Sequence, residues 1–257
     1  MEENRKPVLQ VSELGIDFGG LSAVNGLNME VYEGEIVGLI GPNGAGKTTV
    51  FNMLTKVYQP TRGTIFFDGV DTAKKTVVDM NHAGVARTFQ NIRLFGGLSV
   101  IDNVKTGFHG RITYSPLSAV LRLPVYRAKE REIEERSREL LEVFGLTEEA
   151  DQLASNLPYG AQRRLEIARA LATEPRLLLL DEPAAGMNPQ ETEELMAMIR
   201  LVRDRFHTSI LLIEHDMKLV MGICERITVL NYGMMLAQGT PEEIQANPEV
   251  IKAYLGD

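Results

Sequence analysis

The sequence predicts an α/β protein with a parallel sheet at its core, and the arrangement of its apolar runs carries this prediction. Short, unbroken apolar runs occur at residues 35–40, 176–180 and 209–213. Runs of this kind are typical of parallel strands that are covered by helices on both faces. A helical pattern at residues 191–205 separates the last two runs, and strands that alternate with helices indicate an α/β core.

Two other regions have a different character. Residues 8–11, 27–32 and 63–67 read as short strands joined by tight turns, which predicts an antiparallel β subdomain beside the core. The middle of the chain, roughly residues 100–160, reads as a helical subdomain. Its most charged stretch, residues 127–144, is interpreted as a helix with a solvated face, on which Glu132 with Arg136 and Glu134 with Arg138 are expected to pair.

Composition excludes several classes of protein. The chain has 257 residues, 44% of them hydrophobic and 24% charged, as expected of a globular protein. A net charge of −8 argues against a protein that mainly coats nucleic acid. The single cysteine, Cys224, cannot form an internal disulfide, which favours a reducing compartment. We expect neither a secretory signal nor a membrane span, because no sufficiently long apolar stretch occurs, so a role at a membrane would come through a partner.

A phosphate-binding loop follows the first apolar run. The residues Gly41, Pro42, Asn43, Gly44, Ala45, Gly46, Lys47 and Thr48 fit the pattern G-x-x-x-x-G-K-[ST]. The glycines let several backbone N–H groups point at one anion, and a helix that begins at Thr48 would direct its N-terminus at the phosphates. Lys47 is placed to reach the β- and γ-phosphates, and the Thr48 hydroxyl can bind Mg²⁺.

The other two apolar runs also end in reactive side chains. Asp181 and Glu182 follow the run at 176–180, and Glu214, His215 and Asp216 follow the run at 209–213. Open α/β sheets bind ligands at the carboxyl ends of their strands. Asp181 can hold Mg²⁺ through its water shell, Glu182 can polarise an attacking water, and His215 can donate a hydrogen bond to a γ-phosphate.

These motifs resemble, in their order and over nearly the whole length, the nucleotide-binding subunits of ABC transporters. The resemblance implies the ABC ATPase fold, a P-loop NTPase core with the two subdomains, and it implies ATP and Mg²⁺ as ligands. Phe18 matches the aromatic residue that stacks on adenine, and the phosphate loop extends to Thr49. Gln90 matches the glutamine that contacts Mg²⁺ and the attacking water. Glu182 matches the catalytic base and His215 the switch histidine, while residues 185–188 occupy the position of the D-loop.

The resemblance also implies a domain organisation. Residues 1–257 form a single ABC ATPase domain, in which about 1–90 and 165–240 make the nucleotide-binding core with its β subdomain. Residues 91–164 make the helical subdomain, and 240–257 a C-terminal helical tail. By its sequence that tail is two capped helical turns, which start at Thr240-Pro241 and Asn247-Pro248.

One family motif departs from its usual form. The signature Leu-Ser-Gly-Gly-Gln is replaced by Leu157, Pro158, Tyr159, Gly160 and Ala161. In the family, this segment of one subunit closes over ATP that another subunit holds. Pro158 offers neither a hydroxyl nor an N–H to a γ-phosphate, whereas Gly160 can offer its backbone and a helix from Ala161 its N-terminus. The departure predicts a heterodimer with a second, non-identical ABC ATPase subunit, and a homodimer is the alternative.

Within the family, the match narrows to the ATPases of branched-chain amino acid importers (LivG type). The segments that carry it are residues 87–91, 107–135, 181–189, 213–217 and 239–256. This implies integral membrane permease subunits as partners, an indirect link to a periplasmic or extracellular substrate-binding protein, and no nucleic acid. It places the chain peripherally on the cytoplasmic face of the inner (plasma) membrane.

Other functions of the same fold stay open at this point. They are an ATPase for lipid or lipopolysaccharide export, one for urea or amide uptake, and a soluble ABC ATPase that acts on DNA or ribosomes. The segment at 107–135 and the altered signature favour the importer. A soluble ABC ATPase usually carries two nucleotide domains or a coiled-coil insertion. A P-loop kinase or GTPase gives no reason for Gln90, the signature-like helix and His215 together, and a binding module without catalysis is disfavoured by the intact Asp181-Glu182 pair.

Overall fold

The computed structural model describes residues 6–110 and 115–255, and these residues fall into two compact units. Unit 1 comprises residues Met1–Gln90 and Arg176–Asp257, and unit 2 comprises Asn91–Pro175. Unit 2 extends beyond residue 164, where the helical subdomain was expected to end, because helix α6 (Tyr159–Leu171) belongs to unit 2 throughout. We describe each unit by itself.

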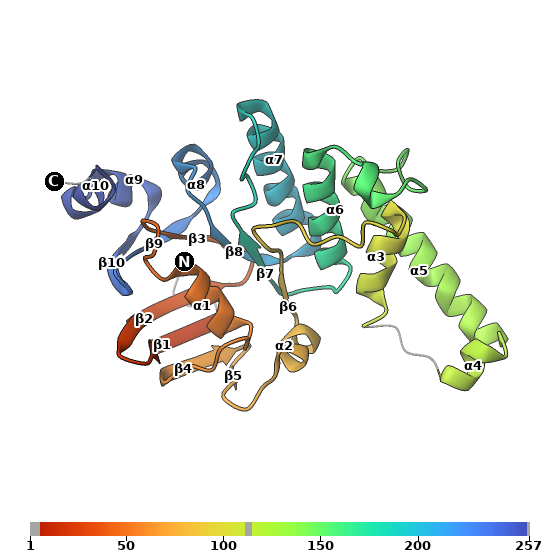
Figure 1. Cartoon of the computed structure of the whole chain (residues 1–257), viewed down its shortest axis with the longest axis horizontal. Coiled ribbons are helices and arrows are strands. Elements are labelled where there is room, and N and C mark those ends of the chain that lie inside the picture. The colour runs from red at the N-terminus through yellow and green to blue at the C-terminus, as the bar shows by residue number, and fades with distance from the viewer. Residues whose placement is uncertain (1–5, 111–114, 256–257) are drawn as a thin grey trace. The chain divides into compact units, whose positions relative to one another are not determined.

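Unit 1 contains a six-stranded sheet in the order β10-β9-β3-β8-β7-β6 (Figure 1). Its strands are β3 (Ile36–Ile40), β6 (Val85–Arg87), β7 (Leu177–Asp181), β8 (Ser209–Ile213), β9 (Arg226–Asn231) and β10 (Met234–Gly239). All neighbours pair in parallel except β10, which pairs antiparallel with β9. The predicted parallel sheet is therefore confirmed, and the three predicted apolar strands β3, β8 and β7 lie side by side with their carboxyl ends at one edge.

The second sheet of unit 1 is antiparallel, as expected, and has the order β2-β1-β4-β5. Its strands are β1 (Pro7–Phe18), β2 (Leu21–Tyr32), β4 (Arg62–Phe67) and β5 (Val70–Asp71). The first two strands are much longer than the short segments predicted from sequence. The pairing of β1 with β2 shifts register at several points, so polar residues and glycines inside these strands are accommodated by irregularities that mask the simple alternation.

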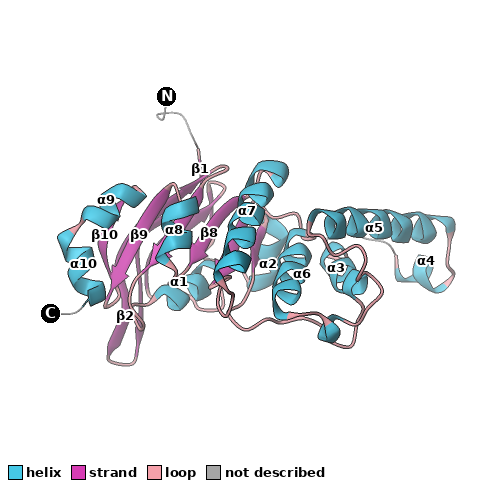
Figure 2. Cartoon of the chain, turned by 90° about the horizontal axis from the view of Figure 1, so that it is seen from above, coloured by secondary structure: helices cyan, strands magenta, loops and turns pink. Residues whose placement is uncertain are grey.

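The core of unit 1 lies between the two sheets, around helix α1 (Lys47–Leu54). Alternate residues of β3, β7 and β8 join side chains of α1 and of the antiparallel sheet in one buried cluster. Helices α7 (Pro189–Phe206) and α8 (Met217–Ile223) lie on the other face of the six-stranded sheet (Figures 1 and 2). There Gly38 faces Cys224 and Val220, and this close approach leaves little room for a side chain. Burial on both faces explains why these strands are continuously apolar.

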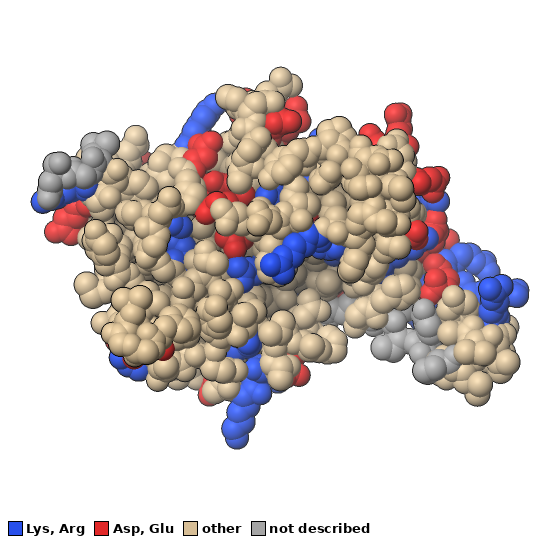
Figure 3. All heavy atoms as spheres, in the orientation of Figure 1, with Lys and Arg blue, Asp and Glu red and all other residues tan. Residues whose placement is uncertain are grey.

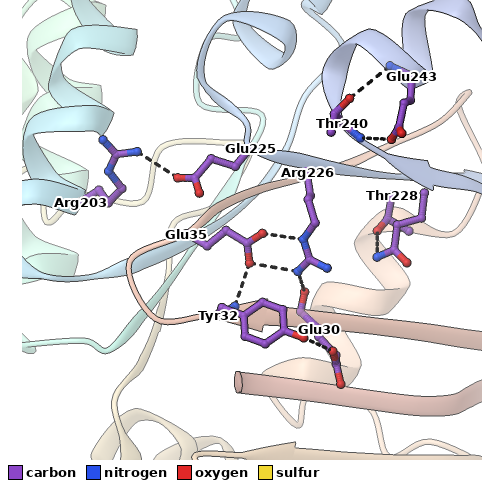
Figure 4. Close-up of polar contacts among 10 residues, drawn as sticks. Glu30, Tyr32, Glu35, Arg203, Glu225, Arg226, Thr228, Thr240 and Glu243 are labelled. Carbon is purple, nitrogen blue, oxygen red and sulfur yellow. Dashed lines mark hydrogen bonds and ion pairs between the residues drawn. The ribbon is translucent and has the colours of Figure 1, made fainter. Parts of the chain in front are cut away.

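The remaining helices of unit 1 are short. They are α2 (Val77–Ala83), α9 (Pro241–Ala246) and α10 (Pro248–Leu255). The predicted starts of the tail helices at Thr240-Pro241 and Asn247-Pro248 are confirmed, and Thr240 forms a capping box with Glu243 (Figure 4).

Arg226 links the two sheets through several hydrogen bonds (Figure 4). Arg226 at the start of β9 bonds through Nε and Nη2 to the nearly buried carboxylate of Glu35, at 2.5 and 3.0 Å. The same Nη2 donates to the backbone carbonyl of Glu30 on β2 at 2.7 Å, and the guanidinium lies over the ring of Tyr32. Glu35 also accepts the N–H of Tyr32. This network joins β2, β3 and β9 at the edge opposite the strand ends that carry the reactive side chains.

Unit 2 is helical, and its elements are α3 (Val100–Phe108), α4 (Pro116–Val120), α5 (Pro124–Val143), the 3-10 helix η1 (Ala154–Asn156) and α6. Of the two ion pairs expected on α5, Glu134 with Arg138 is present at 2.7 Å. The pair of Glu132 with Arg136 is wrong: Glu132 bonds Lys129, and Arg136 pairs with Glu174 and lies over the Phe108 ring. Arg136 thus pairs with a carboxylate outside α5, and its guanidinium also gains the aromatic face of Phe108.

Among the residues described, none of the helices combines the length and the apolar character that a membrane span needs.

Candidate nucleotide-binding site

The phosphate loop joins β3 to α1 and leaves backbone N–H groups free to bind an anion. The helix begins at Lys47, and the first N–H to bond back along it is that of Val50, which reaches the carbonyl of Gly46 at 3.0 Å. The N–H groups of Lys47, Thr48 and Thr49 therefore precede the helical ladder. Asn43, Gly44 and Thr48 are exposed, so the loop and the hydroxyl of Thr48 are accessible.

Two glycines of the loop allow contacts that no other residue would permit. A Cβ on Gly41 would lie 2.1 Å from the carbonyl oxygen of Leu230, and one on Gly46 would lie 2.8 Å from that of Ala23. Both glycines also have positive φ angles, 152° and 103°. The tip of the β9–β10 hairpin supports the same loop, because the N–H of Gly233 donates to the carbonyl of Ala45 at 3.0 Å.

The amine of Lys47 lies inside the loop. Its Nζ donates to the carbonyls of Gly41 at 2.7 Å and Pro42 at 3.0 Å. Burial lowers the pKa of Lys47, and the nearby carboxylates of Glu182 and Asp181 oppose that shift. The phosphate loop and the two acids that follow β7 therefore meet at one place, as the sequence predicted for strand ends at a common edge.

Asp181 is nearly buried and holds an arginine that was not foreseen as its partner. Its Oδ2 bonds Nη2 of Arg87 at 2.7 Å, and both side chains are less than a tenth exposed. Arg87 also donates to Oδ1 of Asn52 on α1, and its guanidinium lies over the rings of Phe51 and of Phe89. The strand β6 thus brings a fixed positive charge to one oxygen of the Asp181 carboxylate.

Glu182 presents a carboxylate that is held at both oxygens. Nε2 of Gln90 donates to Oε2 at 2.7 Å, and Nε2 of His215 lies 2.7 Å from Oε1. The backbone of Glu182 has a φ of 48°, a conformation that costs a non-glycine residue about 1–3 kcal/mol. Its N–H donates to the carbonyl of Ile213 at the end of β8. Three residues that lie far apart in the sequence are thus joined around one carboxylate.

Glu214 lies beside His215 but is buried, 3% exposed. Its carboxylate accepts the N–H groups of Ala184 at 2.7 Å, His215 at 2.9 Å and Asp216 at 3.3 Å. Burial raises the pKa of this carboxyl, and the three N–H donors oppose the shift. Glu214 therefore ties the segment after β7 to the segment after β8, and so fixes Glu182 relative to His215.

Phe18 lies at the end of β1 and is 45% exposed. Its ring meets that of Tyr58 edge to face, with ring centres 5.3 Å apart. Such a ring offers an open face to a flat ligand. Tyr58 was not singled out from sequence, and its spacing from Phe18 carried no signal for the contact.

The C-terminal helix also reaches the phosphate loop. The phenol of Tyr254 lies near the backbone N–H of Gly41, and burial raises the pKa of this phenol to about 12. A cavity of about 750 Å³ adjoins this contact. Its lining comes from the loop, the β9–β10 hairpin and α10: Pro42, Asn43, Gly44, Ala45, Asn231, Tyr232, Leu236, Glu249, Lys252 and Ala253. The proximity of the tail to the phosphate loop is a finding of the structure.

In unit 2, the altered signature forms the start of α6. Leu157 is buried, Pro158 is the N-cap residue and Tyr159 is the first helical residue, 45% exposed. The expected start at Ala161 is therefore two residues late, because Pro158 sets an extended backbone directly before the helix. The first helical bond runs from Gln162 to Pro158, so the N–H groups of Tyr159, Gly160 and Ala161 precede the ladder.

Four contacts near the candidate site were not predicted from the sequence. They are Arg87 with Asp181, Glu214 with Ala184, Phe18 with Tyr58, and Tyr254 with Gly41. For Glu214 a signal existed, since a carboxylate directly after a fully apolar strand is expected to be buried and bonded. For the others, the partners come from elements whose pairing only the tertiary structure reveals.

The fold and the converging strand ends define a P-loop nucleotide-binding protein with a signature-type helix. Residues 24–185 match the family model described as ABC transporter, and residues 235–257 match that of branched-chain amino acid ATP-binding cassette transporter. The chain belongs to the ABC transporter ATP-binding family.

Two curated relatives match almost end to end. The chain is 51% identical over 252 residues to the high-affinity branched-chain amino acid transport ATP-binding protein BraF of Pseudomonas aeruginosa. It is 52% identical over 252 residues to the corresponding protein LivG of Escherichia coli K12. Each alignment covers 98% of this chain and 99% of the relative.

Solved structures agree with the assignment to this family. A nucleotide-free ATP-binding cassette from an ABC transporter superposes with a TM-score of 0.85 and 27% identity, covering 98% of this chain and all of the other. A cassette in its ADP conformation gives the same values. The predicted ABC ATPase fold is confirmed.

Proposed function

We propose that this chain binds and hydrolyses ATP to power the uptake of branched-chain amino acids through a membrane permease. The observation that carries the proposal is the Glu182 carboxylate, which Gln90 and His215 hold at the edge where the phosphate loop lies. The names of the relatives that match end to end support the transported substrate.

ATP binds in this proposal along the loop from Gly41 to Thr49. The free N–H groups at the start of α1 receive the phosphates, and Lys47 leaves its loop carbonyls to meet the β- and γ-phosphates. The exchange is favourable because a phosphate oxygen is a charged acceptor and a carbonyl is a neutral one. The exposed ring of Phe18 receives the adenine.

The residues present also fit Mg²⁺. One oxygen of Asp181 bonds Arg87, whereas Oδ1 has no hydrogen-bond donor within residues 6–110 and 115–255 and can accept from a metal-bound water. Thr48 is an exposed residue and offers a hydroxyl, and Gln90 offers an amide oxygen. Mg²⁺ in nucleotide sites usually takes one or two protein ligands, with phosphates and waters as the rest. When bound, it neutralises charge on the phosphates.

Hydrolysis in this proposal uses Glu182 as general base. Its carboxylate orients a water for in-line attack on the γ-phosphate. Gln90 holds one oxygen in place, and His215 holds the other. His215 can also donate to the γ-phosphate as charge develops there.

The signature supports a heterodimer. The free N–H groups at the start of α6 can bind the γ-phosphate of ATP that a second ABC ATPase subunit holds, but Pro158 removes the hydroxyl that the usual signature offers. A non-identical partner with two unequal sites is therefore favoured over a homodimer. The chain would sit at the cytoplasmic face of the inner membrane on permease subunits, linked through them to a substrate-binding protein.

Co-purification tests this proposal. The chain is tagged, native membranes are extracted in mild detergent, and the bound proteins are identified. We expect a multispanning permease and a second, non-identical ATPase. Recovery of ribosomal or DNA-associated proteins alone would overturn the transport function and leave the ATPase. Equal ATP turnover at both sites of the purified dimer would contradict the proposed inequality.

A further inference from the structure

One end of unit 2 exposes a group of apolar side chains together with arginines. We call the segment from Ser115 to Lys129 the α4–α5 tip; it contains α4, the turn after it and the start of α5. Its five large exposed side chains are Leu117, Val120, Leu121, Leu123 and Val125, with exposed fractions from 42% to 80%. Fractions this high mean that the side chains project from the surface and do not line a groove.

The charge of the tip is of one sign. From Ser115 to Lys129 there is no aspartate or glutamate, while Arg122, Arg127 and Lys129 are basic, in a chain whose net charge is −8. Lys129 is paired with Glu132. Arg122 and Arg127 are exposed and form no ion pair within residues 6–110 and 115–255. In Figure 3, apolar and other uncharged atoms cover the surface around α4, and blue Lys and Arg atoms lie beside them.

The local backbone presents these side chains together. Ser118 is buried, and its hydroxyl bonds the carbonyl of Ser115 at 2.6 Å, so α4 turns its polar residue inward and its apolar residues outward. Arg122 has a φ of 47°, which ends the short helix and starts the turn into Pro124. In α4 the serine is buried and the apolar side chains are exposed, which is the reverse of the arrangement expected for a helix in water.

We propose that the α4–α5 tip binds the surface of an anionic lipid bilayer. Projecting leucine and valine side chains partition into the boundary between headgroups and acyl chains, and arginines beside them bond to lipid phosphates. The long arginine side chains reach the headgroup level while their stems stay with the apolar residues. A lipid surface suits this tip better than a protein groove, because a fluid bilayer adapts to projecting side chains and complements a charge of one sign.

This inference goes beyond the proposed transport function, since binding to lipid requires neither ATP nor a permease. For an ATPase that works on a membrane complex, such a tip would give a contact with the bilayer in addition to the contact with its permease. It would hold unit 2 close to the membrane surface.

The test uses the purified full chain and sedimentation with vesicles. Vesicles of phosphatidylcholine alone are compared with vesicles of phosphatidylcholine and phosphatidylglycerol in equal parts. We expect binding to the anionic vesicles that weakens with added salt. In L117S/V120S and in R122E/R127E, we expect this binding to fall by roughly tenfold or more. Thermal melting and ATP hydrolysis, measured on the same preparations, show that the variants are folded.

Matched controls lie on helix α2 and in the loop before it. V77S/V78S removes two exposed valines, and K74E/K75E makes the same change in net charge as R122E/R127E. We expect both controls to bind like the unchanged chain. If they lose as much binding as the tip variants, the effect is one of general surface character and the proposal is overturned.

A labelled cysteine locates the contact. Cys224 is buried and its pKa is raised to about 12, so a dye reacts selectively with V120C, or with V78C as the control. We expect a polarity-sensitive dye at position 120, and not at 78, to report an apolar environment on anionic vesicles. No response at position 120, or no vesicle binding by the unchanged chain, would overturn the proposal. Capture of the purified permease in detergent that depends on the tip, without vesicle binding, would assign the surface to a protein partner instead.

Discussion

Nε2 of His215 lies 2.7 Å from Oε1 of Glu182, although the two residues follow different strands. The strands β7 and β8 are neighbours in the sheet and pair in parallel, which brings their carboxyl ends together. Gln90 closes the arrangement from the other side of the carboxylate. The account of ATP hydrolysis rests on this group of three side chains.

Replacement of His215 tests its contribution to ATP hydrolysis. In H215A, Glu182 loses one of its two hydrogen-bond partners, and in the proposed mechanism the γ-phosphate loses a donor. We expect kcat for ATP hydrolysis to fall by about a hundredfold or more, with ATP affinity changed by only a few-fold. Steady-state hydrolysis together with equilibrium binding of ATP separates the two effects. Normal kcat would remove His215 from the mechanism.

Lys47 of the phosphate loop should contribute to the affinity for ATP. K47A removes the only charged donor inside the loop and leaves the carbonyls of Gly41 and Pro42 without that donor. We expect ATP affinity to fall by at least about tenfold. Titration with a fluorescent ATP analogue measures this, and unchanged affinity would refute the assignment of the loop. The exposed K74A variant is a control of equal chemistry.

The buried carboxyl of Glu214 should leave a signature in the pH dependence of stability. Its pKa is raised in the folded state, so the folded chain binds this proton more tightly than the unfolded chain does. As the pH falls from neutral toward 4.5, the group therefore adds to the free energy of unfolding, and the gain is lost as the pH rises. The ordinary pKa of a glutamate carboxyl, from which this one is raised, is 4.5.

E214Q cannot titrate and should lack this dependence. We expect the unchanged chain to gain stability relative to E214Q as the pH falls through that window. Denaturant unfolding at a series of pH values measures the difference. A difference that is flat, or that changes in the opposite direction, would show that the Glu214 carboxyl has an ordinary or lowered pKa.

The contact of the C-terminal helix with the phosphate loop should matter for nucleotide affinity. Y254F removes only the phenol oxygen, which lies near the N–H of Gly41. We expect ATP affinity to fall by about fivefold, the equivalent of one neutral hydrogen bond. Y232F, a change in an exposed tyrosine of the adjoining cavity, serves as the control. Equal affinities for Y254F and the unchanged chain would mean that the tail does not support the loop.

Much of unit 1 was predictable because its signals are local. The phosphate loop, the apolar strands and the helix start at Asn188, Pro189 and Glu191 each depend on residues that are close together in the sequence. The meeting of Glu182 with His215 was predictable in outline, since parallel strands end at a common edge.

Other features depend on contacts between distant segments. The irregular pairing of β1 with β2 hid most of the length of both strands. Arg136 contacts Glu174 and Phe108 and does not pair with Glu132 on its own helix, and Arg87 pairs with Asp181. Arginine has several acceptors within reach in any fold, so its choice follows from the tertiary structure and from the desolvation that burial imposes.

Transport coupled to hydrolysis in E182Q tests the central claim most directly. The purified complex is reconstituted in proteoliposomes with its substrate-binding protein, and ATP-driven uptake of labelled leucine is measured beside ATP binding and turnover. The account predicts that E182Q binds ATP with nearly unchanged affinity while turnover and uptake fall together by about a hundredfold or more. Unchanged turnover in E182Q, or full turnover without leucine uptake in the unchanged complex, would contradict it.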